Sequence, residues 1–321
     1  MYRRTFLAAA GLMLARPALA QGTALRIGLI TPPAHQWSKS AVALAARITE
    51  RTQGAVALSV LPAGQLGSES QMLQQLQTGA LDLAFLTIGE FANRDAEFGA
   101  LLAPYLVPDI AAARRLLEKP AAGTLLARTA ALGLVGLGFG LAGMRQTLLR
   151  KPAATGADLA GRKIRALPLP QELDFWSRTG ATPTPLPLPA LYDALANGQI
   201  DGMQIDFEGT WNSRYFDLAQ EMLASNHMMF PMLAVASGRR WKTLPEEVRT
   251  LVGAEVQASL TEILDAYQGI DTTYRSQIEA AGFPVRTVGA EFFGDAVPAW
   301  YDAWRAKTPI LTQLEAEAGR A

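Results

Sequence analysis

Short apolar runs alternate with amphipathic stretches along most of the chain. Ser38–Arg51 carries apolar residues at helical spacing, and Ser68 with Gln71 forms a capping-box signature before a second helix that Gly79 ends. The apolar runs between and beside these helices predict strands at Leu25–Ile30, Val56–Val60 and Leu81–Leu86. Strands that alternate with helices predict βαβ units, and therefore an α/β fold with a largely parallel sheet.

The same alternation resumes in the second half of the chain. A short helix is predicted at Ala190–Asn197, after a segment with proline at every second position between 183 and 189. We interpret that segment as an extended connection stiffened by proline, although a polyproline ligand for a partner domain has the same composition. Further strands are predicted at Val135–Phe139, Lys163–Leu167 and Ile200–Ile205.

One predicted helix is far longer than the others. Pro245 suits a helix start and Gly282 a helix end, and apolar residues keep near-helical spacing throughout Glu246–Ala281. An unbroken helix of this length spans about 54 Å, which exceeds the radius of one lobe and predicts a helix that crosses two. Gly253 and Gly269 weaken the prediction, because glycine in a helix costs about 1 kcal/mol relative to alanine.

The first twenty residues have the pattern of an export signal. Arg3 and Arg4 precede the apolar stretch Phe6–Ala15, and Ala18-Leu19-Ala20 is a small-x-small cleavage site. The stretch is too short to cross a hydrocarbon core of ~30 Å, which favours a cleaved signal peptide at residues 1–20 over a membrane anchor. Arg3-Arg4-Thr5-Phe6-Leu7 is similar to the twin-arginine motif, although the general secretory route stays open. We therefore expect a bacterial periplasmic protein.

Composition then limits the chemistry. The chain has 29 basic and 29 acidic residues, two histidines and no cysteine. Removal of residues 1–20 leaves 26 basic and 29 acidic residues, since three arginines and no acid lie in the leader. A disulfide, a thiolate nucleophile and a three-histidine metal site are excluded, and balanced charge argues against nucleic acid as a partner. We expect neither a metal nor a cofactor.

One glycine motif, in contrast, is typical of a cofactor site. Gly138, Gly140 and Gly143 fit the Gly-x-Gly-x-x-Gly fingerprint of dinucleotide sites directly after a predicted strand. A dinucleotide site needs a helix next, whereas the segment before Pro152 is too short for a crossover helix. We interpret the glycines as a crossing between lobes and keep an exported nicotinamide-dependent oxidoreductase as the alternative.

Four sequence blocks, in order, resemble the substrate-binding proteins of tripartite ATP-independent periplasmic (TRAP) transporters, DctP type. Together they cover nearly the whole predicted mature chain. The blocks are Leu61–Gly67 with Gly79–Ala84, Asp158–Arg165, Gly180–Pro183 with Leu191–Gly202, and His227–Trp241 with Leu244-Pro245.

The resemblance implies an α/β, two-lobe periplasmic binding protein fold with a hinge, which closes on a small ligand. We expect lobe I to comprise residues 21–142 and about 231–270, and lobe II residues 143–230 and about 271–321. The implied function is capture of a small organic carboxylate and its delivery to a TRAP membrane permease, by a monomer and without catalysis. A receptor that docks onto a sensor protein is a further alternative.

The resemblance also implies which residues hold the ligand. Arg165, which ends the Lys-Ile-Arg block, matches the arginine that pairs with the ligand carboxylate, and Arg145 matches a second basic position of the pocket. A guanidinium grips both oxygens of a carboxylate in one plane, which lysine cannot do. The competing interpretation of each arginine is an internal ion pair.

The chain departs from the family where Glu-Asn-Pro often follows Asp-Gly-x. Gln204, Ile205 and Asp206 stand there, so the asparagine contact is lost, while Ile205 and Phe207 make the wall more apolar. We therefore expect a monocarboxylate with an aliphatic or aromatic body rather than a sugar acid. Other candidate rings are Phe175, Trp176 and Trp211.

Three further candidate ligand-binding residues follow the first two predicted strands. Glu69 begins a helix, where it either meets a ligand hydroxyl or amine or is a solvated first-turn acid. His35 and Trp37 lie beyond the first strand, where open α/β sheets bind ligands. For His227 we expect a structural role near the hinge.

Overall fold

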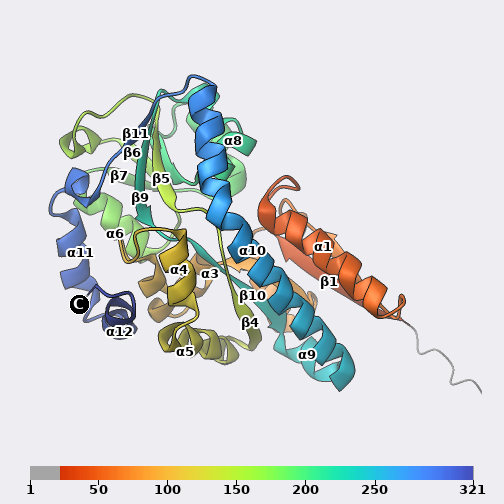
Figure 1. Ribbon diagram of the computed structural model, residues 1–321. Coiled ribbons are helices and arrows are strands. Elements are labelled where there is room, and N and C mark those ends of the chain that lie inside the picture. Colours follow the sequence, from red (N-terminus) through yellow and green to blue (C-terminus); the bar gives the residue numbers. More distant parts are fainter. Residues whose placement is uncertain (1–21, 321) are drawn as a thin grey trace, which may run out of the picture.

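The computed structural model describes residues 22–320, so the predicted signal peptide lies outside the described residues. Two mixed sheets form the framework (Figure 1). The first has the order β2-β1-β3-β10-β4, and its strands are β1 (Thr23–Leu29), β2 (Val56–Leu61), β3 (Leu83–Thr87), β4 (Leu134–Leu141) and β10 (Pro231–Ser237). The second has the order β11-β9-β5-β8-β6-β7, and its strands are β5 (Arg145–Leu149), β6 (Lys163–Ala166), β7 (Thr182–Pro185), β8 (Gly202–Ile205), β9 (Glu221–Met228) and β11 (Val285–Thr287).

Helices pack around both sheets, and the predicted α/β class is confirmed. The cap of α2 is the one that the sequence predicted, since Ser68 and Gln71 exchange both capping-box bonds and Gly79 ends the helix at φ +83°. The helices are α1 (Gln36–Arg51), α2 (Glu69–Thr78), α3 (Ile88–Ala92), α4 (Ile110–Leu117), α5 (Pro120–Arg128), α6 (Pro170–Arg178), α7 (Leu191–Ala196), α8 (Phe207–Asn212), α9 (Gly238–Thr243), α10 (Glu246–Ala280), α11 (Ala296–Trp304) and α12 (Ile310–Glu317).

The sheets are less parallel than predicted. The chain passes from the first sheet to the second between β4 and β5, and returns between β9 and β10, each time without a helix. The strand entered in this way, β5 or β10, runs antiparallel to both of its neighbours. These two strands therefore make both sheets mixed.

The glycine motif serves packing. A Cβ on Gly138 would lie 2.7 Å from Leu260 of α10, so glycine lets that helix approach β4 closely. The motif is followed by β5 and not by a helix, so it lacks the strand–turn–helix context of a dinucleotide site.

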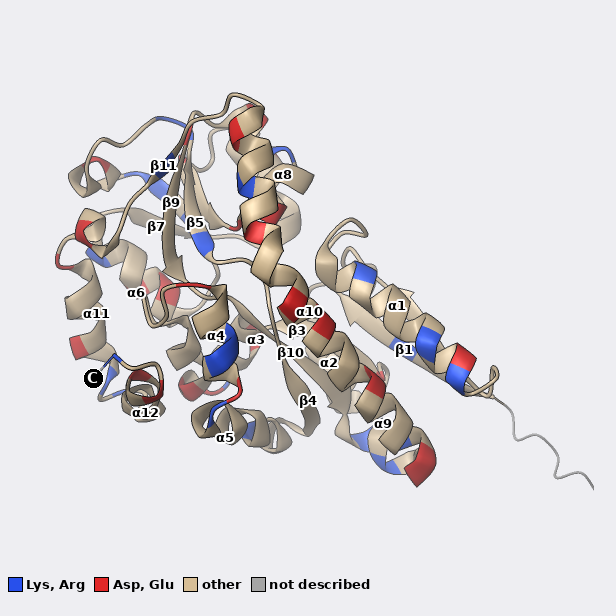
Figure 2. Ribbon diagram, viewed as in Figure 1, with Lys and Arg blue, Asp and Glu red and all other residues tan. Residues whose placement is uncertain are grey.

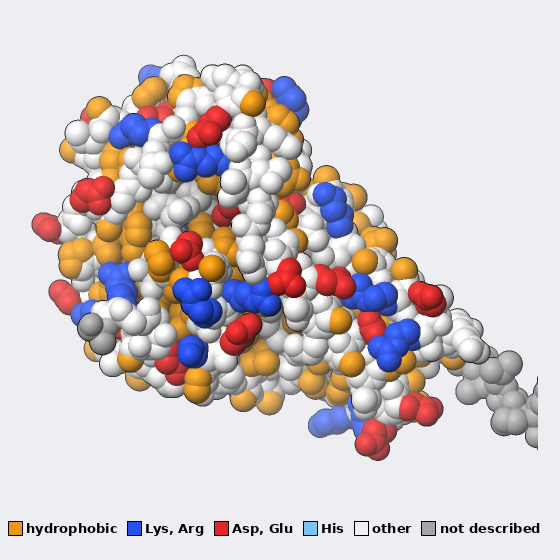
Figure 3. Space-filling view, viewed as in Figure 1, with side chains coloured by type: hydrophobic (Ala, Val, Ile, Leu, Met, Phe, Trp, Pro, Cys, Tyr) orange, Lys and Arg blue, Asp and Glu red, His pale blue; other side chains and the backbone are white. Residues whose placement is uncertain are grey.

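The long helix α10 is continuous over 35 residues, about 52 Å, with Gly253 and Gly269 inside it. It packs against α1 and β4 beside the first sheet and against α8 and β11 beside the second. Figure 2 shows acidic residues of α10 facing basic residues of α1, where Arg47 pairs with Glu255 at 2.9 Å and Glu262 at 3.1 Å. On the face in Figure 3, charges of both signs are interspersed. Among the described residues, no helix is both long and apolar enough to cross a bilayer.

The C-terminal segment does not stay with the second sheet. The helix α11 packs against α6, but α12 packs against η1 (Ala96–Leu102) and α5, which adjoin the first sheet. The Ile310 N–H donates to Glu97 at 3.0 Å, and Leu311 and Leu314 are buried there. We expect residues beyond about 271 in lobe II, whereas α12 contacts elements beside the first sheet, and the lobe boundaries stay a prediction.

Candidate functional site

A cavity of about 420 Å³ lies between the two sheets, and most of its lining surface is apolar. The first sheet contributes the segment after β1, the starts of α1 and α2 and the end of β3, and the second contributes β5 and the segments after β6, β7 and β8. Its lining includes the apolar residues Ile30, Pro32, Trp37, Ala142, Leu167, Pro168, Pro185, Leu186, Pro187, Leu188, Ile205 and Phe230. The polar ones are Thr31, His35, Ser68, Glu69, Thr87, Glu90, Arg145, Arg165, Asp206, Asn212 and Ser213.

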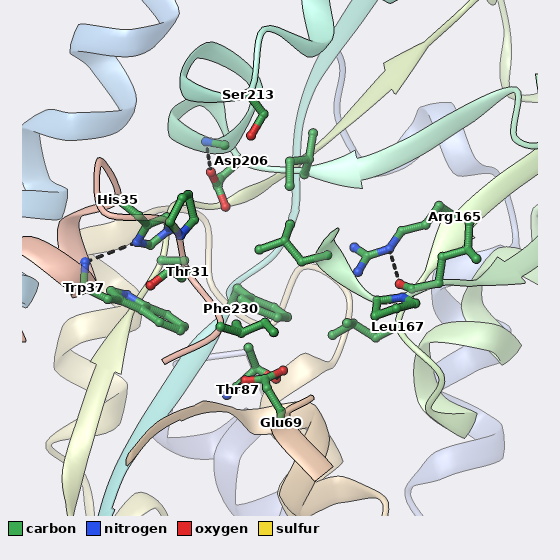
Figure 4. A pocket seen from close by; sticks show the side chains of 18 of the residues that line it. Thr31, His35, Trp37, Glu69, Thr87, Arg165, Leu167, Asp206, Ser213 and Phe230 are labelled. Carbon is green, nitrogen blue, oxygen red and sulfur yellow. Dashed lines mark hydrogen bonds between the residues drawn. The ribbon is translucent and has the colours of Figure 1, made fainter. Parts of the chain in front are cut away.

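Arg165 carries the unpaired positive charge of this cavity. Its side chain extends from β6, only 2 % of the residue is exposed, and the guanidinium points into the cavity (Figure 4). Its Nε donates to the Leu186 carbonyl at 2.9 Å, which fixes the plane of the group. Within residues 22–320, no carboxylate lies within 4 Å of Arg165, whereas buried charges are ordinarily paired.

The surroundings of Arg165 lower its pKa but leave it charged at neutral pH. Burial, with a smaller contribution from Arg145, lowers the pKa to about 10 against the opposing effect of the nearby Glu172 carboxyl. Glu172 is itself fully buried and accepts a hydrogen bond from the Leu167 N–H at 2.8 Å, and burial raises its pKa.

Arg145 also lines the cavity, but it is ion-paired. Its Nη1 lies 2.5 Å from Oδ2 of Asp206, and its guanidinium lies over the Phe230 ring at 3.5 Å from the ring centre. The two interpretations of Arg145 made from the sequence, pocket residue and internal ion pair, therefore both describe its position.

Glu69 and Thr87 form a second polar group of the cavity, away from Arg165 in Figure 4. The Glu69 carboxylate accepts from the Thr87 N–H at 2.7 Å and from the Thr87 hydroxyl at 2.9 Å. Desolvation raises the pKa of Glu69 to about 7, against the two hydrogen bonds, which lower it. Glu69 is therefore a cavity residue that titrates near neutral pH and not a solvated first-turn acid.

His35 and Trp37 lie at the start of α1, across the cavity from Arg165. Nδ1 of His35 caps the helix by accepting from the Trp37 N–H at 3.2 Å, and its Nε2 lies 3.5 Å from Glu208. Burial lowers the pKa of His35 to about 4, so the ring is neutral at pH 7. The Trp37 indole donates to the Leu141 carbonyl at 2.7 Å, which leaves its carbon face as cavity wall.

Of the two apolar residues expected in the wall of the site, only one lines the cavity. Ile205 lines the cavity, but Phe207 does not: it is the first residue of α8 and packs into the core of the second sheet with Tyr215 and Met222. We expected both on one wall of the site, but β8 ends at Ile205 and Phe207 begins the helix α8.

The other predicted rings also lie elsewhere. Phe175 and Trp176 are buried around His227, and Trp211 stacks on Phe216. His227 lies 2.9 Å from the Ser225 hydroxyl and 3.2 Å from the Gln204 side-chain oxygen, and it is fully buried away from the cavity. These residues build the core of the protein and not the site.

Three acidic residues in or near the cavity were not predicted as site residues from the sequence. Asp206 is the N-cap of α8, a position that its place before a short helix could have suggested. Glu208 accepts from the Tyr267 hydroxyl at 2.5 Å, and Asp271 accepts from the Met144 N–H at 2.9 Å. Burial raises the pKa of both acids to about 7.

Comparison with known proteins gives a consistent result across the chain. The profile of "Bacterial extracellular solute-binding protein, family 7" (DctP) matches residues 27–306. The sialic acid-binding periplasmic protein SiaP of Vibrio cholerae is 24% identical over 301 residues, which are 92% of each chain. An uncharacterized protein, y4mM of Sinorhizobium fredii, is 29% identical over 304 residues, which cover 89% of this chain but only 56% of that protein. This chain therefore spans little more than half of that relative.

The solved structures show the same fold. A TRAP periplasmic solute-binding protein from Bradyrhizobium sp. btai1, in complex with α/β-D-galacturonate, superposes with a TM-score of 0.85 at 27% identity. The superposition covers 92% of this chain and 99% of that one.

Proposed function

This chain belongs to the DctP family, the bacterial extracellular solute-binding proteins of family 7, and from that premise we propose that it captures a small organic carboxylate with Arg165. The family's role is to bind small organic acids in the periplasm and to deliver them to a TRAP membrane permease. Binding without catalysis is accordingly the proposed task of the cavity, by a monomer that is exported with a cleaved leader.

The observation that carries this proposal is the state of Arg165. Its guanidinium is buried, faces the cavity and has no carboxylate within 4 Å among the described residues. A charge in such a position is stabilised by an anion that enters the cavity, and a carboxylate matches the geometry of the guanidinium.

The body of the ligand meets apolar walls. A charge-assisted hydrogen bond contributes about 1.5–3 kcal/mol, whereas micromolar binding requires about 8 kcal/mol. Burial of roughly 200 Å² of apolar ligand surface against Trp37, Ile205 and Phe230 contributes about 5 kcal/mol. Two relatives bind the sugar acids sialic acid and galacturonate, but this lining supports a monocarboxylate with an aliphatic or aromatic body.

A thermal-shift screen of the mature protein against aliphatic, aromatic and sugar carboxylic acids tests the proposal. A ligand that binds only the folded state raises the melting temperature by an amount set by its concentration relative to its Kd. We expect apolar monocarboxylates to do so, and Arg165→Ala to weaken their binding roughly 10- to 150-fold, the equivalent of one charged hydrogen bond.

The matched control is Arg178→Ala, because Arg178 lies at the surface in an ion pair with Asp174 at 2.7 Å. This variant should keep the full ligand-induced shift. An Arg165→Ala protein that is folded and binds as tightly as the native protein would refute Arg165 as the anchor. Stabilisation by sugar acids alone would refute the apolar ligand body.

A further inference from the structure

The register of the second sheet places a carboxylate directly on the second arginine of the cavity. Strands β5 and β8 are antiparallel with Gln146 opposite Ile205, so Arg145 and Asp206 are the next pair outward. Nη1 of Arg145 lies 2.5 Å from Oδ2 of Asp206, and both residues are buried, with 6 % and 3 % of their surface exposed. The ion pair therefore follows from strand pairing and is shielded from water.

Both members of the pair are held from behind as well. The other carboxylate oxygen of Asp206 accepts from the Gly209 N–H at 2.6 Å, as the N-cap of α8. The Cζ atom of Arg145 lies over the Phe230 ring, 3.5 Å from its centre. Because backbone and ring fix the two groups, a ligand cannot easily turn Arg145 away from Asp206.

The charges that line the cavity then leave room for one anionic group. Arg145 and Asp206 cancel, His35 is neutral at pH 7 and Glu90 is paired with Arg94 at 3.1 Å. Arg165 remains as the cavity-lining cation, within residues 22–320, that has no carboxylate within 4 Å. A second carboxylate on the ligand would be buried near Asp206 or Glu69 without a cation of its own, and desolvation of an unpaired charge is strongly unfavourable.

We infer that Asp206 is a specificity-determining residue: by neutralising Arg145 it restricts the cavity to ligands with a single carboxylate. This inference rests on the proposed function and deepens it. Removal of the Asp206 charge would release Arg145 to bind a second carboxylate and convert the site toward dicarboxylates.

The test compares acids of equal carbon number with one or two carboxylates, namely butanoate with succinate, pentanoate with glutarate and hexanoate with adipate. Calorimetry measures both Kd values of each pair for the native protein and for Asp206→Asn. Asparagine retains the helix cap, because its side-chain oxygen still accepts from the Gly209 N–H. We expect the native protein to prefer the monocarboxylate at least 30-fold in the pair that binds best, and Asp206→Asn to shift this ratio at least 10-fold toward the dicarboxylate.

Two further variants separate this specificity from a loss of structure. Asp109→Asn makes the same change at the N-cap of α4, where Asp109 accepts from the Ala112 N–H at 2.8 Å outside the cavity, and should leave the ratio unchanged. Adding Arg145→Gln to Asp206→Asn should abolish the gained dicarboxylate binding.

The outcomes are distinct. Equal binding of both acids of a pair by the native protein, or an unchanged ratio in Asp206→Asn, would overturn the inference alone. A gain that persists in the double variant would also overturn it. Failure of every acid to bind the native protein would overturn the proposed function and this inference together.

Discussion

The main-chain N–H of Gln36 donates a hydrogen bond of 2.8 Å to Glu208, and this bond joins the first turn of α1 to α8 on the other side of the cavity. The second oxygen of Glu208 accepts from the Tyr267 hydroxyl of α10 at 2.5 Å. One buried side chain thus ties together three helices that belong to different sheets.

Glu208→Ala is expected to destabilise the protein by about 2–4 kcal/mol, because it leaves the Gln36 N–H and the Tyr267 hydroxyl without their acceptor. Urea unfolding monitored by tryptophan fluorescence measures this. Glu208→Gln retains one acceptor oxygen and should lose less. The exposed Glu118→Ala is the control and should change the free energy of unfolding by less than about 0.5 kcal/mol. An unchanged unfolding midpoint in Glu208→Ala would contradict the role of this contact.

The stability of the protein should depend on pH through Asp271. Burial, together with the charges of Asp206 and Glu208, raises the pKa of Asp271 to about 7 against the Met144 N–H and Arg145, which lower it. A carboxyl with a raised pKa in the folded state contributes stability at low pH, and this stability is lost as pH rises toward 7. Between pH 5.5 and 8 the loss is on the order of 2 kcal/mol.

Asp271→Asn removes that titration. The melting temperature of the variant minus that of the native protein should therefore rise by roughly 5 °C between pH 5.5 and pH 8. Differential scanning calorimetry of both proteins across this range measures the difference, and the other titrating groups cancel in the comparison. A difference that is constant with pH would show that Asp271 does not titrate between pH 5.5 and 8.

Binding of an anionic ligand should weaken as Glu69 ionises. The pKa of Glu69 is raised to about 7, and the group faces the same cavity as Arg165. Its deprotonation places a negative charge near the ligand, so Kd should rise several-fold from pH 6 to pH 8. Calorimetric titration with the best monocarboxylate at three pH values measures this, and Glu69→Gln should flatten the dependence. A ligand ammonium near Glu69 would reverse the slope.

Two glycines should respond to alanine in opposite directions. A Cβ on Gly143, between β4 and β5, would lie 2.1 Å from Oδ1 of Asp271 and 2.9 Å from Cβ of Asp206, whereas a Cβ on Gly269 meets no atom within 4 Å. Gly143→Ala should therefore lower the melting temperature by several degrees. Gly269→Ala, inside α10, should raise it by about 2–4 °C, since alanine stabilises a helix by about 1 kcal/mol relative to glycine. A stable Gly143→Ala protein would show that the crossing can shift.

The sequence predicts best where the signal is local. The spacing of apolar residues places the end of α10 within one residue of Ala280, and the Ser68 capping box is read directly from residue types. Arg165 was proposed from a motif and lies in the cavity, because the end of β6 adjoins the space between the sheets. In such cases neighbours along the chain determine the result.

The pairing of distant strands could not be predicted in the same way. The Arg145–Asp206 ion pair depends on the antiparallel register of β5 and β8, and nothing in either segment encodes that register alone. Phe207 lies outside the cavity because the chain turns at Asp206 from β8 into α8, and Phe207 then packs into the core of the second sheet. Both cases concern the step from local structure to tertiary contacts, which single-sequence patterns do not contain.

Because α10 is continuous, the face that it turns toward the first sheet determines the face that it turns toward the second sheet. Each residue turns a helix by about 100°, so deletion of one residue between Glu255, which meets α1, and Tyr267, which meets α8, would rotate one contact face away from its partner. Tyr267 and Asp271 lie four residues apart on one face of the helix, so the deletion would break both the Tyr267–Glu208 and the Asp271–Met144 hydrogen bonds. Changes of length within this helix are therefore tolerated only near its ends.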